Sequence, residues 1–174
     1  LNAAEDPELS FPTRSVVLAD VDGDSDLDLI VGNYNKANRL YLNDGTGEYG
    51  YGVDIDATAY KTTSIAAGDF DNDAKMELVV GNDDESMRLY EWDSINNKFG
   101  TRTDILDSSK KTTVVTLANV DGDANLELIV GTEKQGVFLY NASGDAFGAP
   151  TAIESATTYQ NTSLALADVD GDSD

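Results

Sequence analysis

The chain has 174 residues, and its 33 acidic and 11 basic side chains give a formal net charge of −22 at pH 7. Such a charge repels nucleic acid and anionic membranes, which excludes both as partners, whereas it suits divalent cations. Cysteine and histidine are absent, which excludes disulfides, Cys/His zinc sites and Ser-His-Asp catalysis. No apolar run reaches the ~18 residues that a membrane span needs, so no membrane insertion is expected.

One acidic motif recurs along the chain at nearly constant spacing. DVDGDSDLDLIVGN at 20–33 returns as DFDNDAKMELVVGN at 69–82 and as NVDGDANLELIVGT at 119–132, and DVDGDSD returns at 168–174. A period of about 50 residues is typical of propeller blades. We expect one repeat domain over 1–174, with units at approximately 14–62, 63–112 and 113–161 and a truncated unit at 162–174.

Each unit predicts four short strands. The first is the β-branched or small run before the acidic motif, such as SVVLA at 15–19, and the second is the apolar run that ends the motif. The third is an RLY-type run, as at 39–41, and the fourth begins near an aromatic–glycine pair, as at 49–50. Consecutive apolar residues in the second strand indicate burial on both faces. The fold class predicted is all-β: propeller-type blades of four antiparallel strands, three blades plus the start of a fourth, in a partial propeller or open array.

The acidic loop followed by L-[DE]-L-[IV]-V-G, together with FGAP at 147–150, resembles the FG-GAP/VCBS repeat. That family forms the β-propeller of integrin α-subunits and of many bacterial surface and secreted proteins. The resemblance extends over three copies and a fragment. It implies a calcium ion in the hairpin loop between the first two strands of each blade, in a D-x-D-x-D-x-x-x-D pattern whose seventh position offers its backbone carbonyl.

The residues themselves also point to calcium. Oxygen donors without nitrogen or sulfur favour Ca²⁺ or Mg²⁺, and acids that alternate with tolerated Asn suit the flexible shell of ~6–8 oxygens around Ca²⁺. An EF-hand needs Gly at loop position 6 and a bidentate Glu at position 12. The three complete copies instead have Ser25, Ala74 and Ala124 at position 6, and Val31, Val80 and Val130 at position 12.

Comparison of the copies separates ligands from other positions. Positions 1, 3, 5 and 9 carry oxygen in every complete copy, whereas position 7 varies and includes Lys75, whose side chain cannot bind a cation. Asn119 leaves the third loop one carboxylate short, so it should bind more weakly, and the fourth copy lacks a ninth position. The predicted calcium-site residues, position 7 included for its carbonyl, are Asp20, Asp22, Asp24, Asp26 and Asp28; Asp69, Asp71, Asp73, Lys75 and Glu77; Asn119, Asp121, Asp123, Asn125 and Glu127; and Asp168, Asp170 and Asp172.

Several features have a second interpretation. The acidic loops could be metal-free Asx turns on an acidic surface, and paired carboxylates also serve glycoside hydrolysis. Acids repeated in every blade favour a scaffold over one asymmetric active site. The third-strand aromatic residues fit packing between blades better than a sugar-binding stripe, and two asparagines begin N-glycosylation sequons. The aromatic residues are Tyr41, Tyr90, Trp92 and Tyr140, and the sequon residues are Asn141 and Asn161.

The sequence therefore predicts a non-catalytic, calcium-stabilised extracellular scaffold or adhesion module, acting as a subunit of a surface filament or larger assembly. The alternative is a propeller fragment of a secreted polysaccharide-acting enzyme or a carbohydrate-binding module. We expect protein partners or self-association, with carbohydrate as a further candidate. Because the chain begins at Leu1 and its fourth unit is broken, we expect it to be a piece of a larger propeller.

Overall fold

The computed structural model describes residues 11–100, 103–105, 111–155 and 158–167. Within these ranges the chain forms β-strands and no helix, so no helix there is long and apolar enough to cross a membrane. The strands are β1 (Thr13–Ala19), β2 (Asp28–Lys36), β3 (Arg39–Tyr41), β4 (Val53–Asp54), β5 (Tyr60–Gly68), β6 (Glu77–Asn82), β7 (Arg88–Asp93), β8 (Lys98–Phe99), β9 (Thr103–Asp104), β10 (Thr112–Ala118), β11 (Glu127–Thr132), β12 (Val137–Tyr140) and β13 (Thr151–Glu154).

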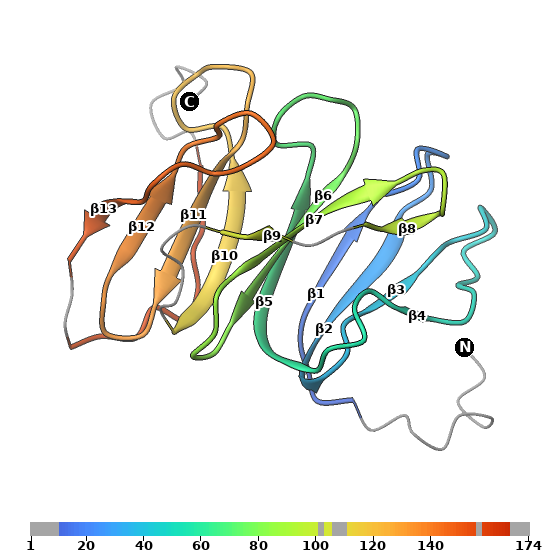
Figure 1. The fold of residues 1–174 in the computed structure, drawn as a ribbon, viewed down its shortest axis with the longest axis horizontal. Coiled ribbons are helices and arrows are strands. Elements are labelled where there is room, and N and C mark those ends of the chain that lie inside the picture. Colours follow the sequence, from blue (N-terminus) through green and yellow to red (C-terminus); the bar gives the residue numbers. More distant parts are fainter. Residues whose placement is uncertain (1–10, 101–102, 106–110, 156–157, 168–174) are drawn as a thin grey trace.

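The strands form three antiparallel blades that stand side by side in chain order (Figure 1). Blade 1 contains β1–β4, blade 2 contains β5, β6, β7 and β9, and blade 3 contains β10–β13. The short strand β8 pairs with the end of β7. Each fourth strand starts just after an aromatic–glycine pair. The predicted all-β blades of four strands are therefore confirmed.

The same register recurs in the first hairpin of every blade. Ala19 pairs with Asp28, Gly68 with Glu77, and Ala118 with Glu127. The ninth motif residue thus opens the second strand, and the preceding acidic positions form the hairpin tip. All three tips lie at one edge of the structure, at the top of Figure 1.

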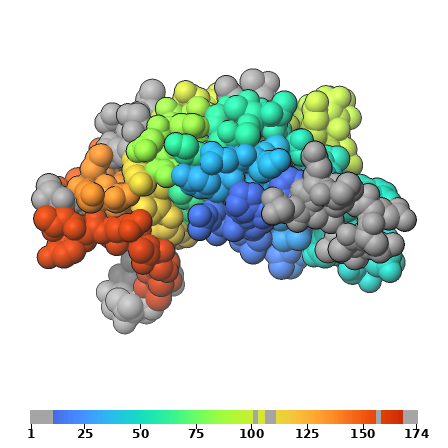
Figure 2. All heavy atoms as spheres, turned by 90° about the horizontal axis from the view of Figure 1, so that it is seen from below, coloured from blue at the N-terminus to red at the C-terminus, as the bar shows by residue number. Residues whose placement is uncertain are grey.

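Two apolar clusters hold the blades together. One lies between blades 1 and 2 and includes Ile30, Ile65 and Leu78; the other lies between blades 2 and 3 and includes Val79 and Leu128. Figure 2 shows the packed blades as one continuous band, from orange and red in blade 3 to blue and cyan in blade 1. Strands β6 and β11 are buried at every residue, as their consecutive apolar residues predict.

Strand β2 differs from its equivalents. Its burial alternates over residues 28–31, with Asp28 and Ile30 buried and Leu29 and Val31 half-buried. Blade 1 packs against a described blade on one side only, so a sequence that resembles β6 and β11 has one covered face instead of two. The aromatic residues follow the same division: Tyr90, Trp92 and Tyr140 are buried in the inter-blade clusters, whereas Tyr41 is half-buried.

The fourth unit departs from the prediction within its described part. Residues 161–167 contain the SLALA run at 163–167 but form no strand. In the other units the equivalent run pairs with the strand that follows the acidic loop. The predicted ligands Asp168, Asp170 and Asp172 lie outside the described residues.

Candidate metal centres

Each hairpin tip depends on a residue with positive φ at motif position 4. Gly23, Asn72 and Gly122 have φ angles of 81°, 61° and 76°. Only Gly, and to a lesser degree Asn, adopts this left-handed conformation without steric cost. The alternation of Gly and Asn at this position is the sequence signal for the turn, and the metal-ligand pattern alone does not reveal it.

The residue at motif position 1 accepts hydrogen bonds from backbone N–H groups of the hairpin tip. Asp20 Oδ1 accepts the N–H groups of Gly23 at 2.8 Å and Asp24 at 3.1 Å, and its Oδ2 accepts the N–H of Ser25 at 3.0 Å. Asp69 accepts from Asp73 and Ala74 in the same way, and Asn119 accepts from Asp121 and Gly122. The Asx-turn interpretation is therefore correct for the backbone. It is compatible with metal binding, because a carboxylate oxygen has two lone pairs.

The acid at motif position 9 closes the base of each hairpin tip through a hydrogen bond. Asp28, Glu77 and Glu127 are buried, and each accepts the backbone N–H of the second motif residue. These bonds are 3.0 Å to Val21, 3.1 Å to Phe70 and 3.0 Å to Val120. Each of these acids consequently holds the loop closed, and Asp28 accepts a second N–H, from Asn43, through its other oxygen.

The tips bring three carboxylates together in every complete copy, with one oxygen of each within 4.8 Å of the others. Positions 1, 3 and 9 meet in the first two loops, and positions 3, 5 and 9 meet in the third. Asp24, Asp73 and the three residues at position 7 lie outside these clusters. The clusters are Asp20, Asp22 and Asp28; Asp69, Asp71 and Glu77; and Asp121, Asp123 and Glu127.

In loop 1, backbone N–H groups bond to Asp20 and Asp28, but one carboxylate oxygen of the cluster is left uncompensated. Asp22 Oδ1 is buried and has no hydrogen-bond partner among the described residues. Burial, followed by repulsion from Asp28 and Asp24, raises the pKa of Asp22, and burial also raises the pKa of Asp28. A buried, unpartnered carboxylate oxygen beside two further carboxylates is the environment that a hard cation with oxygen ligands would stabilise. The residues present therefore fit Ca²⁺.

In loop 2 burial and the neighbouring carboxylates also raise the pKa of the acid at motif position 9. Burial raises the pKa of Glu77 to about 8, and the neighbouring carboxylates of Asp71, Asp73 and Asp69 add to the shift. Burial likewise raises the pKa of Asp71.

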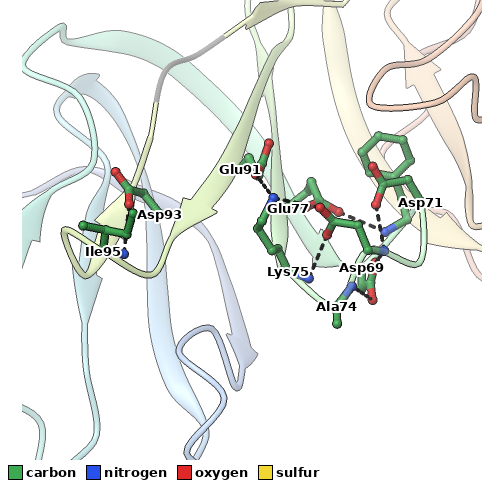
Figure 3. Close-up of polar contacts among 10 residues, drawn as sticks. Asp69, Asp71, Ala74, Lys75, Glu77, Glu91, Asp93 and Ile95 are labelled. Carbon is green, nitrogen blue, oxygen red and sulfur yellow. Dashed lines mark hydrogen bonds and ion pairs between the residues drawn. The ribbon is translucent and has the colours of Figure 1, made fainter.

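Loop 2 also contains a cation of its own. Lys75 Nζ lies 2.8 Å from Asp73 Oδ2 and forms a second ion pair with Glu91 on strand β7 (Figure 3). The hydrogen bond from Lys75 lowers the pKa of Asp73, and both acids raise the pKa of Lys75. The fifth-position acid is thus held by an ammonium group, whereas Asp24 in loop 1 accepts the backbone N–H of Asp26.

The residue that ends the VGN or VGT segment has a structural role that the ligand pattern does not predict. Asn33 Nδ2 donates to Ala37 O at 2.8 Å, Asn82 Nδ2 to Ser86 O at 2.9 Å, and Thr132 Oγ1 to Gly136 O at 2.8 Å. All three are buried. These side chains close the second hairpin of each blade, and their repetition at motif position 14 is the signal that could have identified them.

The two sequon asparagines differ in their environment. Asn161 is half-buried, and its Nδ2 donates to the carbonyl oxygens of Thr132 at 3.1 Å and Gly136 at 3.2 Å. Asn141 is exposed. N-glycosylation replaces one of the two hydrogens of Nδ2, so at Asn161 it would remove at least one of these bonds, whereas exposed Asn141 is free of this cost.

Comparison with known proteins agrees with the blade architecture. No curated protein matches the sequence. A solved structure described as BBS1N in complex with ARL6DN, soaked with lead, matches with a TM-score of 0.57 at 13% identity. The match covers 88% of this chain and 46% of that chain, so the chain spans under half of its structural relative and the likeness concerns the fold, a β-propeller. A family model described as FG-GAP-like repeat matches residues 20–80, 70–130 and 119–174, and the chain belongs to this repeat family.

Proposed function

We propose that this chain is a non-catalytic scaffold module whose acidic hairpin tips bind Ca²⁺, and that it serves outside the cell as part of a larger assembly. The observation that carries the proposal is the buried, unpartnered Oδ1 of Asp22 within a cluster of three carboxylates. Equivalent clusters stand at the same end of all three blades.

The binding residues follow from the clusters. Positions 3 and 9 belong to every cluster, so Asp22 with Asp28, Asp71 with Glu77, and Asp121 with Glu127 would supply the common ligands. When bound, Ca²⁺ supplies positive charge that offsets the repulsion between these carboxylates. The protein residues hold the hairpin tip in shape through the first and ninth positions. The site would consequently stabilise a fold instead of activating a substrate.

The scaffold role is supported by repetition. Each blade carries a cluster of three carboxylates on the same hairpin, whereas a catalytic site usually combines different groups in one place. An extracellular location is supported by the calcium requirement, since millimolar external calcium would fill even sites of modest affinity. Adhesion and filament formation are the assembly roles that we consider within this proposal.

Calcium removal is the direct test. We expect EDTA to lower the melting temperature markedly and added CaCl₂ to restore it, because a ligand that binds only the folded state stabilises it by mass action. The measurement is thermal unfolding followed by circular dichroism. MgCl₂ at the same concentration should restore less, since Mg²⁺ requires a strict octahedral shell.

A triple variant, Asp22→Asn, Asp71→Asn and Asp121→Asn, provides the matched control. Asparagine retains an acceptor oxygen at position 3 and removes one charge from each cluster. This variant should fold and should lose most of the response to CaCl₂. A wild-type melt that EDTA leaves unchanged, with no heat of calcium binding in calorimetry, would refute the calcium proposal.

A further inference from the structure

The tip of loop 2 contacts blade 3 through two segments. The first is loop 3, the acidic loop of blade 3, where Leu126 N–H donates to Phe70 O at 3.0 Å and the carbonyl oxygen of Ala124 accepts from Asn72. The second is the turn between β12 and β13, where the ring of Phe147 stacks on the ring of Phe70 with centroids 4.4 Å apart. Figure 1 shows this orange turn beside the green loop of blade 2. Blade 3 therefore reaches the metal-site loop of the preceding blade.

The turn between β12 and β13 carries one acid, Asp145, at its exposed end. A bridge between Ala142 and Phe147 closes this turn, and Ser143 N–H donates to Ala146 O at 2.7 Å. Phe147 follows Asp145 by two residues, so its stacking on blade 2 also places Asp145 near loop 2.

Asp145 adds a negative charge beside a cluster that already holds three carboxylates. Burial raises the pKa of Asp71, and repulsion from Asp145, after that from acids of loop 2 itself, adds to the shift. A like charge at short range acts in this direction. Because Asp145 is not one of the three carboxylates that meet in loop 2, it acts on the cluster from outside.

The tip contacts bring this repulsion into the junction between blades 2 and 3. Lys75 directs its ammonium group to Asp73 and Glu91, so the positive charge of loop 2 is engaged with those two acids. A divalent cation within the cluster would attract Asp145 as well as the loop acids, because charges interact across several ångströms at a protein surface. The acid that opposes the junction without metal would then strengthen it.

We propose that the metal site of loop 2 is shared by two blades: Asp145 of blade 3 supplies an outer carboxylate, so a cation bound in loop 2 joins blade 3 to blade 2. The inference rests on the proposed function, because it requires a cation in the loop 2 cluster. The spacing of the acidic motif does not show this role, since Asp145 belongs to a different repeat from the cluster that it serves.

The effect of Asp145→Asn should consequently depend on calcium. The variant is compared with a background protein that carries Asp22→Asn and Asp121→Asn, which leave loop 2 as the only one of the three described loops with its full cluster. In EDTA the variant should melt no lower than the background protein, because a repelling charge has been removed. In millimolar CaCl₂ it should melt lower. Calorimetric titration at low ionic strength should show a calcium affinity reduced on the order of fivefold.

Glu154→Gln in the same background is the matched control. It removes the same charge from blade 3, but Glu154 lies opposite Val137, at the end of β12 that is away from the turn. This control should bind calcium like the background protein, and Asp145→Glu, which keeps the charge, should retain most of the affinity. Far-UV circular dichroism checks that each variant is folded.

Two results would overturn the shared site and leave the calcium proposal intact. One is equal calcium affinity of Asp145→Asn and Glu154→Gln. The other is a loss of melting temperature in Asp145→Asn that is the same in EDTA and in CaCl₂, which is the behaviour of a purely structural residue. A folded background protein that binds no calcium would refute the metal site of loop 2 itself, and the shared site with it.

Discussion

The first and second acidic loops have acids at the same four ligand positions, yet their charge is compensated differently. In loop 1, Asp22 retains a buried oxygen without a partner and position 7 is another acid, Asp26. In loop 2, Lys75 occupies position 7 and pairs with Asp73 and Glu91. Among the described residues, no basic side chain pairs with the loop 1 cluster, whereas loop 2 supplies part of the positive charge from its own chain. Equal ligand spacing thus does not imply equal calcium affinity.

The largest effect is expected from the ninth position of loop 2. Glu77→Ala leaves the buried N–H of Phe70 without its acceptor, which should lower the free energy of unfolding by about 1–3 kcal/mol even in EDTA. Glu77→Gln keeps an acceptor and removes the charge. It should unfold near the wild-type temperature in EDTA but gain less from calcium. Chemical denaturation with and without EDTA measures both quantities, and equal losses in EDTA for the two variants would contradict the assigned bond.

A smaller effect is expected when position 7 is exchanged between the loops. Lys75→Asp releases Asp73 and removes a positive charge from loop 2, so its calcium affinity should rise on the order of tenfold at low ionic strength. Asp26→Lys should weaken loop 1 by a similar factor. Calorimetric titration of each single variant measures the affinities, and high salt should reduce both changes because exposed charges are screened. If neither substitution changes the calcium affinity, the inferred effect of the position 7 charge on the two loops is wrong.

The smallest effect is expected from Glu91→Gln. This change removes the charge of one of the two carboxylates that pair with Lys75 and leaves Asp73 paired. Because the ion pair is exposed, we expect no resolvable change in melting temperature and a change in calcium affinity of about twofold or less. A large change would show that Glu91, and not Asp73, is the main partner of Lys75.

The sequence predicted the blades because each repeat carries local information. The first hairpin is specified by an apolar run, an acidic turn and a second apolar run, and three copies remove the ambiguity that a single copy would have. The meeting of positions 3 and 9 was also predictable, since both are acids in every complete copy.

Other features depended on tertiary neighbours. The 60% exposure of Val16 could not be read from SVVLA, because its sequence resembles that of buried equivalents, against which a neighbouring described blade packs. The pairing of Lys75 with Glu91 joins a loop to β7, which spacing within the motif does not encode. The structural role of Asn33 required knowledge of where the second hairpin turns.

The two blade junctions differ at the acidic tips. Blades 1 and 2 are joined by strand β2, which pairs at Tyr34 and Lys36 with the start of β5. Blades 2 and 3 are joined near the start of β10, where Thr63 Oγ1 donates to Thr112 O at 2.8 Å, and also at the tips, where Leu126 N–H donates to Phe70 O at 3.0 Å and Asn72 donates to Ala124 O. Under the proposed function, removal of calcium would loosen the tip contacts of blade 3 and leave the pairing of β2 with β5 in place.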